Sequence, residues 1–210
     1  MGNRAVITTK ENFENNGVGV YLHWNGGRDS VEAFLGYCKK KGYRPPSQDC
    51  YGWARLVQVI ANFFGGSTSI GIDVVNNLDC DNWDNGVYLI DGWDIVGREY
   101  FDGIEQDEYD MAEMMIGIDE CQPVNEQLGD YLKGVPCKVE DIQIGDKVAY
   151  MHWSGSIEYA TINEFGEDMV CNGTNVKGLP YTGKYPKDNI NAYIKNDTEG
   201  LVKIIDKEGD

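Results

Sequence analysis

The chain has 210 residues, of which 41% are hydrophobic and 11% aromatic, which is enough for a packed core and excludes wholesale disorder. Its 35 acidic residues outnumber its 18 basic ones and give a formal net charge of −17. This charge repels phosphate backbones and anionic lipids, so we expect no direct nucleic-acid partner and no membrane partner. The length fits two compact domains, or one domain with a sizeable appendage.

The start of the chain is polar and lacks the apolar stretch of a secretory signal, and no apolar run approaches the length of a membrane span. We therefore expect a cytoplasmic protein. The cysteines are scattered without a C-x-x-C pair, and the only histidines are His23 and His152. This pattern predicts free thiols, no metal site and no cofactor. The six cysteines are Cys38, Cys50, Cys80, Cys121, Cys137 and Cys171.

The first predicted elements are two short strands and a helix. Runs of β-prone residues at 4–8 and 18–24, joined by a polar loop, predict a hairpin. Apolar residues spaced by three and four positions then predict a helix, which Asp29 or Ser30 can cap at its start. Three lysines complement the negative charge at the C-terminal end of this helix, and Gly42 is expected to end it.

The next helix is expected from about residue 47 to 64, and it is apolar nearly all round, which predicts a buried helix. Further strands are predicted at 69–75, 87–90 and 95–101. A short helix rich in acidic residues and methionine is expected over 106–116.

These elements predict an α+β fold in two parts. Residues 1–122 are expected to form an N-terminal antiparallel sheet with two or three packed helices. Residues 123–136, with two glycines and two prolines, are the expected linker, and residues 137–210 the expected small β-rich, barrel-like lobe. The polar stretch 184–189 is expected to be a long loop. Strands in the lobe are predicted at residues 147–152, 157–163, 168–171, 191–195 and 201–205.

The negative charge is concentrated in residues 73–120, which hold fifteen acidic residues and one basic residue, Arg98, for a net charge of −14. Aromatic residues are interspersed with these acids. One interpretation is a solvated acidic face. The other is an interface to a basic protein, in which the field speeds encounter and the rings supply affinity. The predicted interface residues are Asp79, Asp81, Trp83, Asp84, Asp91, Trp93, Asp94, Asp102, Glu105, Asp107, Glu108, Asp110 and Glu113.

Calcium is one alternative role for part of this stretch. Residues 79–86 pack carboxylates beside an Asn-Gly turn, and oxygen ligands are what Ca²⁺ prefers. The EF-hand order is not met, because Trp83 occupies the third ligand position and no flanking helix pair is evident. We therefore expect no calcium site.

A second alternative is a nucleotide pocket. His23 and Trp24 offer an imidazole beside an indole, and the glycine-rich turn after them leads into a predicted helix start, which can offer backbone N–H groups to a phosphate. A plain strand–helix turn is the competing interpretation. The motif Y-φ-H-W-(N/S)-G recurs at residues 150–155. The candidate ligand-binding residues are His23, Trp24, Asn25, Gly26, Gly27 and Arg28.

A third alternative is a cysteine hydrolase. The run Asp49-Cys50-Tyr51-Gly52 resembles the D-C-S-G motif of the NlpC/P60-type cysteine peptidases, with tyrosine in place of serine, and residues 145–148 are similar to that family's G-D-x-V strand. The resemblance implies Cys50 as nucleophile and His152 as base. The competing interpretation is a buried thiol at the start of a core helix.

Three runs, residues 2–8, 21–27 and 49–55, are similar to those of small acidic proteins encoded by phages, plasmids and conjugative elements of Gram-positive bacteria. This resemblance covers about the first hundred residues and implies an accessory protein of a mobile element; some comparable proteins are anti-CRISPR proteins acting on type II Cas9. It assigns no residue a role. Together with the charge, it predicts a non-enzymatic inhibitor of a basic host effector such as a Cas9-like nuclease. The alternatives are a protein that sequesters a nucleotide immune signal and the cysteine hydrolase.

Overall fold

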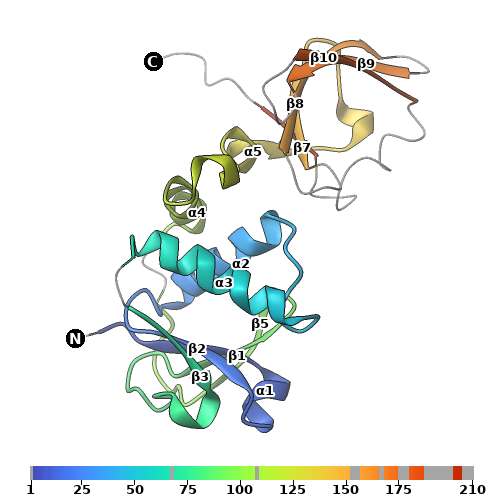
Figure 1. Cartoon of the computed structure of the whole chain (residues 1–210). Coiled ribbons are helices and arrows are strands. Elements are labelled where there is room, and N and C mark those ends of the chain that lie inside the picture. Colours follow the sequence, from blue (N-terminus) through green and yellow to red (C-terminus); the bar gives the residue numbers. More distant parts are fainter. Residues whose placement is uncertain are drawn as a thin grey trace. The chain divides into compact units, whose positions relative to one another are not determined.

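The computed structural model divides the chain into two compact units, residues 1–127 and 128–210, which we call unit 1 and unit 2 and describe separately (Figure 1). The division falls inside the stretch expected to be a linker. No helix in the described part is both long and apolar enough to cross a membrane. The structure describes residues 2–66, 69–106, 109–151, 157–165, 168–174, 180–186 and 201–204.

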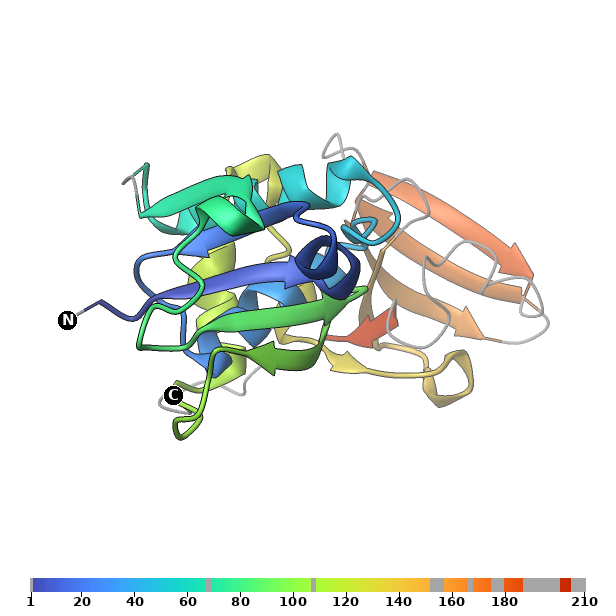
Figure 2. The ribbon, with the colours of Figure 1, turned by 90° about the horizontal axis from the view of Figure 1, so that it is seen from below.

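Unit 1 contains a five-stranded sheet in the order β3-β2-β1-β4-β5, and Figure 2 shows the face of this sheet that lies away from the long helices. The neighbours pair antiparallel except β1 and β4, which run parallel. The expected hairpin of β1 and β2 is confirmed, and the sheet is mostly rather than wholly antiparallel. A parallel pair needs a crossover, and here three helices and two strands lie between β1 and β4 in the chain. The strands are β1 (Ala5–Thr9), β2 (Val18–Leu22), β3 (Ile70–Val74), β4 (Val87–Asp91) and β5 (Asp94–Glu99).

Helices α2 (Arg28–Lys40) and α3 (Cys50–Phe63) cover one face of this sheet, and α4 (Met111–Glu120) packs against these two helices (Figure 1). The ring of Phe34 meets that of Phe63 edge-on, with centroids 5.3 Å apart. The predicted α+β class, with helices packed on the sheet, is therefore confirmed. Fully or almost fully buried helix side chains are Val31, Phe34, Leu35, Leu56, Val59, Ile60 and Ile118.

The opposite face of the sheet carries a smaller core under α1 (Lys10–Glu14) and the 3₁₀ turn η1 (Val75–Asn77). Because both faces of the central strands are covered, β1 is buried along its whole length. The members of this core are Val6, Val87 and Leu89, with Phe13, Tyr21, Leu78 and Cys80 packed against them.

The ends of α2 agree only partly with the sequence prediction. Gly42 adopts φ +62° and its N–H donates to the carbonyl of Lys39, so the predicted glycine stop is confirmed. At the other end the N-cap is Gly27, without a side-chain cap. Asp29 is instead buried, and it accepts a hydrogen bond from the backbone N–H of Tyr109 at 2.9 Å.

Two helix predictions need correction. Full burial of α3 is wrong: Leu56 and Ile60 are buried, but Tyr51 is 64% exposed, because only one side of the helix meets the sheet and its neighbouring helices. Helix α4 begins five residues later than predicted. Its start is set by Asp110, whose carboxylate accepts from the N–H of Glu113 at 2.9 Å.

Unit 2 is a curved six-stranded sheet in the order β10-β9-β8-β7-β11-β6. In the described residues the outer strands β10 and β6 do not pair with each other, so the expected barrel is not closed. Strand β10 occupies part of the stretch expected to be a loop, and the strand predicted at 191–195 lies outside the described residues. The strands are β6 (Val135–Pro136), β7 (Lys147–Met151), β8 (Ile157–Phe165), β9 (Asp168–Thr174), β10 (Pro180–Pro186) and β11 (Leu201–Lys203).

Short helical segments flank these strands. The turn η2 (Val124–Glu126) ends unit 1, and α5 (Asp130–Lys133) begins unit 2. The turn η3 (Val139–Asp141) covers one face of the second sheet. The core on that face consists of Val139, Ile142, Val148, Tyr150, Ala160, Ile162 and Leu201.

Candidate interaction surface

Two acidic segments meet at one end of the first sheet, the end at which β1 and β4 begin, which we call the near end. Residues 79–86 lead into β4, and residues 99–106 start at the last residue of β5; because β4 and β5 are antiparallel, both segments lie at the near end. Arg98 joins them by donating to the carbonyl of Asn85. We call residues 79–86 and 99–106 the acidic loop pair. It has six acidic residues and no basic residue: Asp79, Asp81, Asp84, Glu99, Asp102 and Glu105.

The first loop of the pair is organised around the fully buried side chain of Asn82. Its Nδ2 donates to the carbonyls of Asp79 at 3.0 Å and Gly86 at 3.2 Å. Its Oδ1 accepts from the backbone N–H groups of Asp84 at 3.1 Å and Gly86 at 3.0 Å. One amide therefore satisfies backbone groups at both ends of the loop and fixes its conformation.

The second loop is held by Arg98, whose side chain is 12% exposed. The guanidinium carbon lies 3.7 Å from the ring centroid of Tyr88 and 3.9 Å from that of Phe101, a cation–π stack on both faces. Its Nη1 donates to both carboxylate oxygens of Glu105 at 2.7 Å. Arg98, the sole basic residue of the acidic stretch, therefore serves to anchor this loop.

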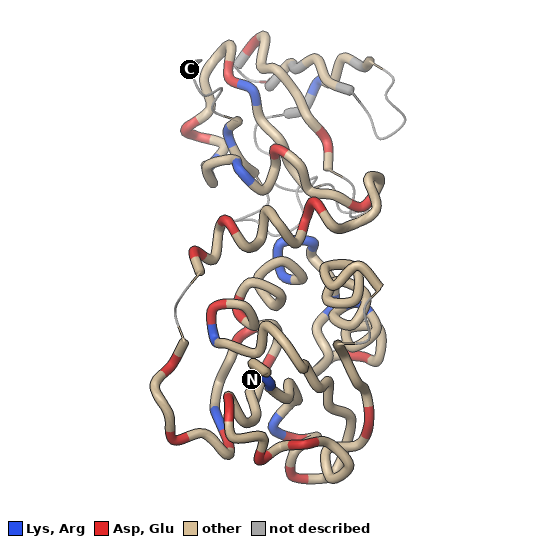
Figure 3. The backbone as a smooth tube through the Cα atoms, turned by 90° about the vertical axis from the view of Figure 1, so that its left-hand side faces the viewer, with Lys and Arg blue, Asp and Glu red and all other residues tan. Residues whose placement is uncertain are grey.

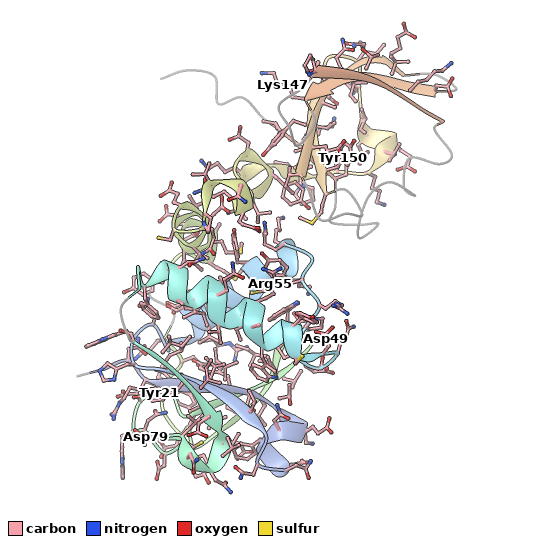
Figure 4. The ribbon with its side chains drawn as sticks, in the orientation of Figure 1. Tyr21, Asp49, Arg55, Asp79, Lys147 and Tyr150 are labelled. Atoms are coloured by element: carbon pink, nitrogen blue, oxygen red, sulfur yellow. The ribbon has the colours of Figure 1, made fainter. Side chains whose placement is uncertain are left out.

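Arg4 binds two acids of the first loop. Its Nε lies 2.7 Å from Oδ2 of Asp84, and its Nη1 lies 3.5 Å from Oδ2 of Asp79. Partial burial opposes ionisation of Asp84, but the hydrogen bonds from the side chain and backbone of Arg4 outweigh it, so the pKa of that carboxyl is lowered. Figure 4 shows Asp79 near Tyr21 at this end of the sheet.

Three of the six acids in the loop pair, Asp79, Asp84 and Glu105, thus form ion pairs with arginines. Within the described residues, no basic group pairs with the other three, Asp81, Glu99 and Asp102, and all three are exposed. Figure 3 shows acidic positions spaced along the chain that leads from β5 towards α4. The near end therefore presents an uncompensated negative field.

Large apolar side chains stand among these free carboxylates. Trp83 is 89% exposed, Ile104 93% and Tyr100 58%. Trp83 and Tyr100 adopt φ +59° and +53°, the left-handed region that costs energy for residues other than glycine. Rings on such loops, within a field of one sign, are the ingredients of a protein-binding surface.

The turn between β4 and β5 does not belong to this surface. Asp91 and Asp94 lie at the opposite end of the sheet, which we call the far end, because β4 carries the chain away from the near end. Asp94 pairs there with Lys39 at 3.1 Å. Trp93 is buried and its Nε1 donates to the carbonyl of Tyr43 at 2.9 Å, so its assignment as an exposed binding ring is wrong.

The remaining residues of the predicted interface lie beyond the second loop. Asp110 and Glu113 are exposed at the start of α4, where one carboxylate oxygen of Asp110 caps the helix. Asp107 and Glu108 lie outside the described residues. The single predicted surface is therefore divided, and the acidic loop pair is the part with free acids and exposed rings together.

The loop at 79–86 has the composition of a calcium loop but uses it differently. Asn82 points inward to the backbone, and Asp79 and Asp84 face Arg4. Across the described residues, no group of three or more His, Cys, Asp or Glu side chains could hold a metal ion.

The glycine-rich turn before α2 is covered by acidic and carbonyl groups. Arg28 is bound by Glu32 at 2.7 Å and by Glu105 at 3.4 Å. A Cβ atom on Gly27 would lie 2.9 Å from Oε1 of Gln106, which shows how closely the second loop covers this turn. These partners offer an incoming phosphate little free positive charge.

The other residues of the nucleotide alternative lie at the near end. The rings of His23 and Trp24 meet edge-on with centroids 5.0 Å apart, and Trp24 is 44% exposed. The hydroxyl of Tyr21 lies 3.4 Å from Nδ1 of His23. Asn25 adopts φ +55°, and Gly26 accepts a hydrogen bond from the hydroxyl of Tyr88 at 2.9 Å. His23 and Trp24 are exposed at the end of the sheet that carries the acidic loop pair, whereas Gly26 and Gly27 are buried.

The hydrolase alternative has only one of its two residues in the described part. Cys50 is exposed at the start of α3, so the interpretation of a buried thiol is wrong. The helix is capped by Asp49, which accepts from the N–H groups of Tyr51 at 3.0 Å and Gly52 at 3.3 Å. His152 lies outside the described residues, as does most of the repeated motif at 150–155.

Comparisons of this chain with models of protein families, with curated proteins and with solved structures found no match. The similarity to accessory proteins of mobile elements therefore stays a prediction from the sequence. Sequence reasoning missed the three residues that shape the surface, Arg4, Asn82 and Arg98. The one sign in the sequence was the isolation of Arg98 within an otherwise acidic stretch.

Proposed function

We propose that this protein is a non-enzymatic inhibitor that binds a basic, nucleic-acid-targeting effector of the host, such as a Cas9-like nuclease, through the acidic loop pair. Such effectors hold nucleic acid in positively charged channels, and an anionic protein surface can occupy such a channel in its place. The anti-defence role rests on the similarity to mobile-element proteins, and the binding role rests on the surface itself.

The observation that carries this proposal is the combination of free acids and exposed rings on fixed loops. Asp81, Glu99 and Asp102 have no ion pair in the described part, while Trp83 and Ile104 are almost fully exposed beside them. The side chains of Asn82, Arg4 and Arg98 hold these loops from beneath. A preorganised surface loses little conformational entropy on binding, and its charge steers a cationic partner to it.

The test compares two triple variants with the same change in charge. The near-end variant carries Asp81→Lys, Glu99→Lys and Asp102→Lys. The matched far-end variant carries Glu11→Lys, Glu14→Lys and Asp91→Lys, all exposed residues of α1 and the β4–β5 turn. Each is titrated into DNA cleavage by a purified type II Cas9–guide RNA complex, and binding is measured in parallel at about 0.1 M and 0.5 M salt.

We expect the near-end variant to need at least about tenfold more protein for half-inhibition, and the far-end variant to stay within about twofold of the wild type. Wild-type binding should weaken steeply with salt, because exposed charges are screened. Equal inhibition by both variants would show that the acidic loop pair is not the interface. Absence of inhibition by the wild-type protein would refute this effector as the target.

A further inference from the structure

The second unit contains a polar cavity that has no part in the proposed function. It has a volume of about 250 Å³ and lies on the sheet face opposite the Val148–Tyr150 core. Its side-chain lining includes three polar residues from adjacent strands, Lys147, Thr161 and Asn172. A cavity of this size suits a ligand smaller than the drug-sized molecules that fill most protein pockets.

Strand register arranges these three side chains in a row. Lys147 on β7 lies opposite Thr161 on β8, and Thr161 lies opposite Asn172 on β9. Side chains of directly opposed residues share a face, and adjacent strands are about 4.8 Å apart, so the row spans about 10 Å. Figure 4 shows Lys147 at the beginning of its strand.

The row is rich in hydrogen-bond donors. The hydroxyl of Thr182 donates to Oδ1 of Asn172 at 2.8 Å, which fixes the orientation of that amide and makes its Nδ2 group the donor of the pair. The ammonium of Lys147 and the hydroxyl of Thr161 add further donors. This side of the cavity is therefore suited to a carboxylate.

The lining also includes an acidic residue. Asp130, at the start of α5, is exposed and belongs to the lining. The ring of Tyr159 forms a wall, and its hydroxyl is fixed by donating to the carbonyl of Leu128 at 3.1 Å. A simple anion would be repelled by Asp130, whereas a ligand with an ammonium group would be bound by it.

We propose that this cavity binds a small zwitterion, with its carboxylate on the Lys147–Thr161–Asn172 row and its ammonium group on Asp130. A free α-amino acid and a short peptide share this chemistry. The site is independent of the acidic loop pair, so its failure and that of the inhibitor function are separately measurable.

The test uses ligand-observed NMR saturation transfer on the full chain. The probes are L-alanine and L-alanyl-L-alanine, which distinguish an amino acid from a peptide. Alaninamide lacks the carboxylate, N-acetylalanine lacks the ammonium group, and methyl glucoside is a neutral polar control. The protein variants are Lys147→Met and Asp130→Asn, with Lys138→Met as the matched control, since Lys138 is exposed and outside the cavity lining.

We expect at least one zwitterionic probe to bind at millimolar concentration or below, and both alaninamide and N-acetylalanine to bind at least tenfold more weakly. Lys147→Met should remove the preference over alaninamide, and Asp130→Asn the preference over N-acetylalanine, while Lys138→Met changes neither. Binding that is equal in all three variants would overturn the proposal. So would binding of methyl glucoside alone, or of no probe.

Discussion

The substitution Asn82→Ala tests whether one buried amide fixes the first loop of the acidic loop pair. It removes four hydrogen bonds of 3.0 to 3.2 Å and leaves the buried N–H of Gly86 without its partner. The carbonyl of Gly86 keeps the N–H of Val6 as a donor at 2.9 Å, so the loss is partial. Each hydrogen bond contributes about 1 kcal/mol net to stability. Because the loop can relax after the substitution, we expect the free energy of unfolding to fall by about 3 kcal/mol, which is less than the sum for the four bonds.

Hydrogen exchange followed by mass spectrometry measures this loss separately for the two units. Amides of β1 and β4 that exchange by unfolding of unit 1 should lose about 150-fold in protection, the equivalent of 3 kcal/mol. Peptides from β7 and β8 should be unchanged. Asn76→Ala is the matched control, because Asn76 is exposed and its side chain makes no hydrogen bond in the described part.

A loss of protection below about threefold would refute the assigned role of Asn82, because solvent would then be replacing its hydrogen bonds at little cost. The variant Asn82→Asp separates the structural role from calcium binding. It keeps the acceptor, removes the donor and adds a buried negative charge, so it should be less stable than the wild type. Restoration of its stability by added Ca²⁺ would contradict the structural interpretation.

Three further predictions concern the same unit. Gly86→Ala should destabilise it by more than about 2 kcal/mol in urea unfolding, because Gly86 has φ +59° and an added Cβ would collide with two backbone carbonyl oxygens; a smaller loss would contradict the close approach of the two loops at this glycine. The pKa of Asp84 is lowered in the folded state, so this group stabilises the fold above its unfolded pKa, and the stabilisation is lost as the pH falls through its folded pKa. The wild type should therefore melt at a higher temperature than Arg4→Gln at about pH 6, and this difference should shrink towards about pH 2. A difference that stays constant would contradict the pairing of Arg4 with Asp84. Trp93→Phe should lower the free energy of unfolding by about 1–3 kcal/mol in the same urea assay, and Trp83→Phe by less than about 0.5 kcal/mol, since only Trp93 is buried and hydrogen-bonded. Equal losses would contradict the assignment of Trp93 to the core and Trp83 to the surface.

Periodicity and turn residues were sufficient to predict most elements of unit 1. The spacing in α2 and the glycine after it are local features, and a local pattern determines them. The start of α4 was missed because several acids precede it, and only the hydrogen bond of Asp110 distinguishes the true cap. The exposed side of α3 was missed because composition alone does not show how many neighbours a helix has.

The candidate surface could be predicted only in part. The concentration of acids in residues 73–120 is visible in the sequence. The sequence does not show that β4 runs from the near end to the far end and so separates Asp91 and Trp93 from the acidic loop pair, because this depends on the topology of the sheet. The parallel pairing of β1 with β4 joins residues about eighty positions apart, which no local pattern encodes. The inward role of Asn82 likewise depends on contacts that form only in the folded chain.

The position of β11 has a consequence for biosynthesis. This three-residue strand lies between β7 and β6, and its Leu201 and Val202 are buried. During translation, β6 and β7 leave the ribosome long before β11, which pairs with both of them. Until β11 has also left the ribosome, the strand edges of β6 and β7 that it will join are unpaired. A premature stop before residue 201 would therefore remove an inner strand of the sheet rather than trim its margin, and the product should be a substrate for cellular proteases.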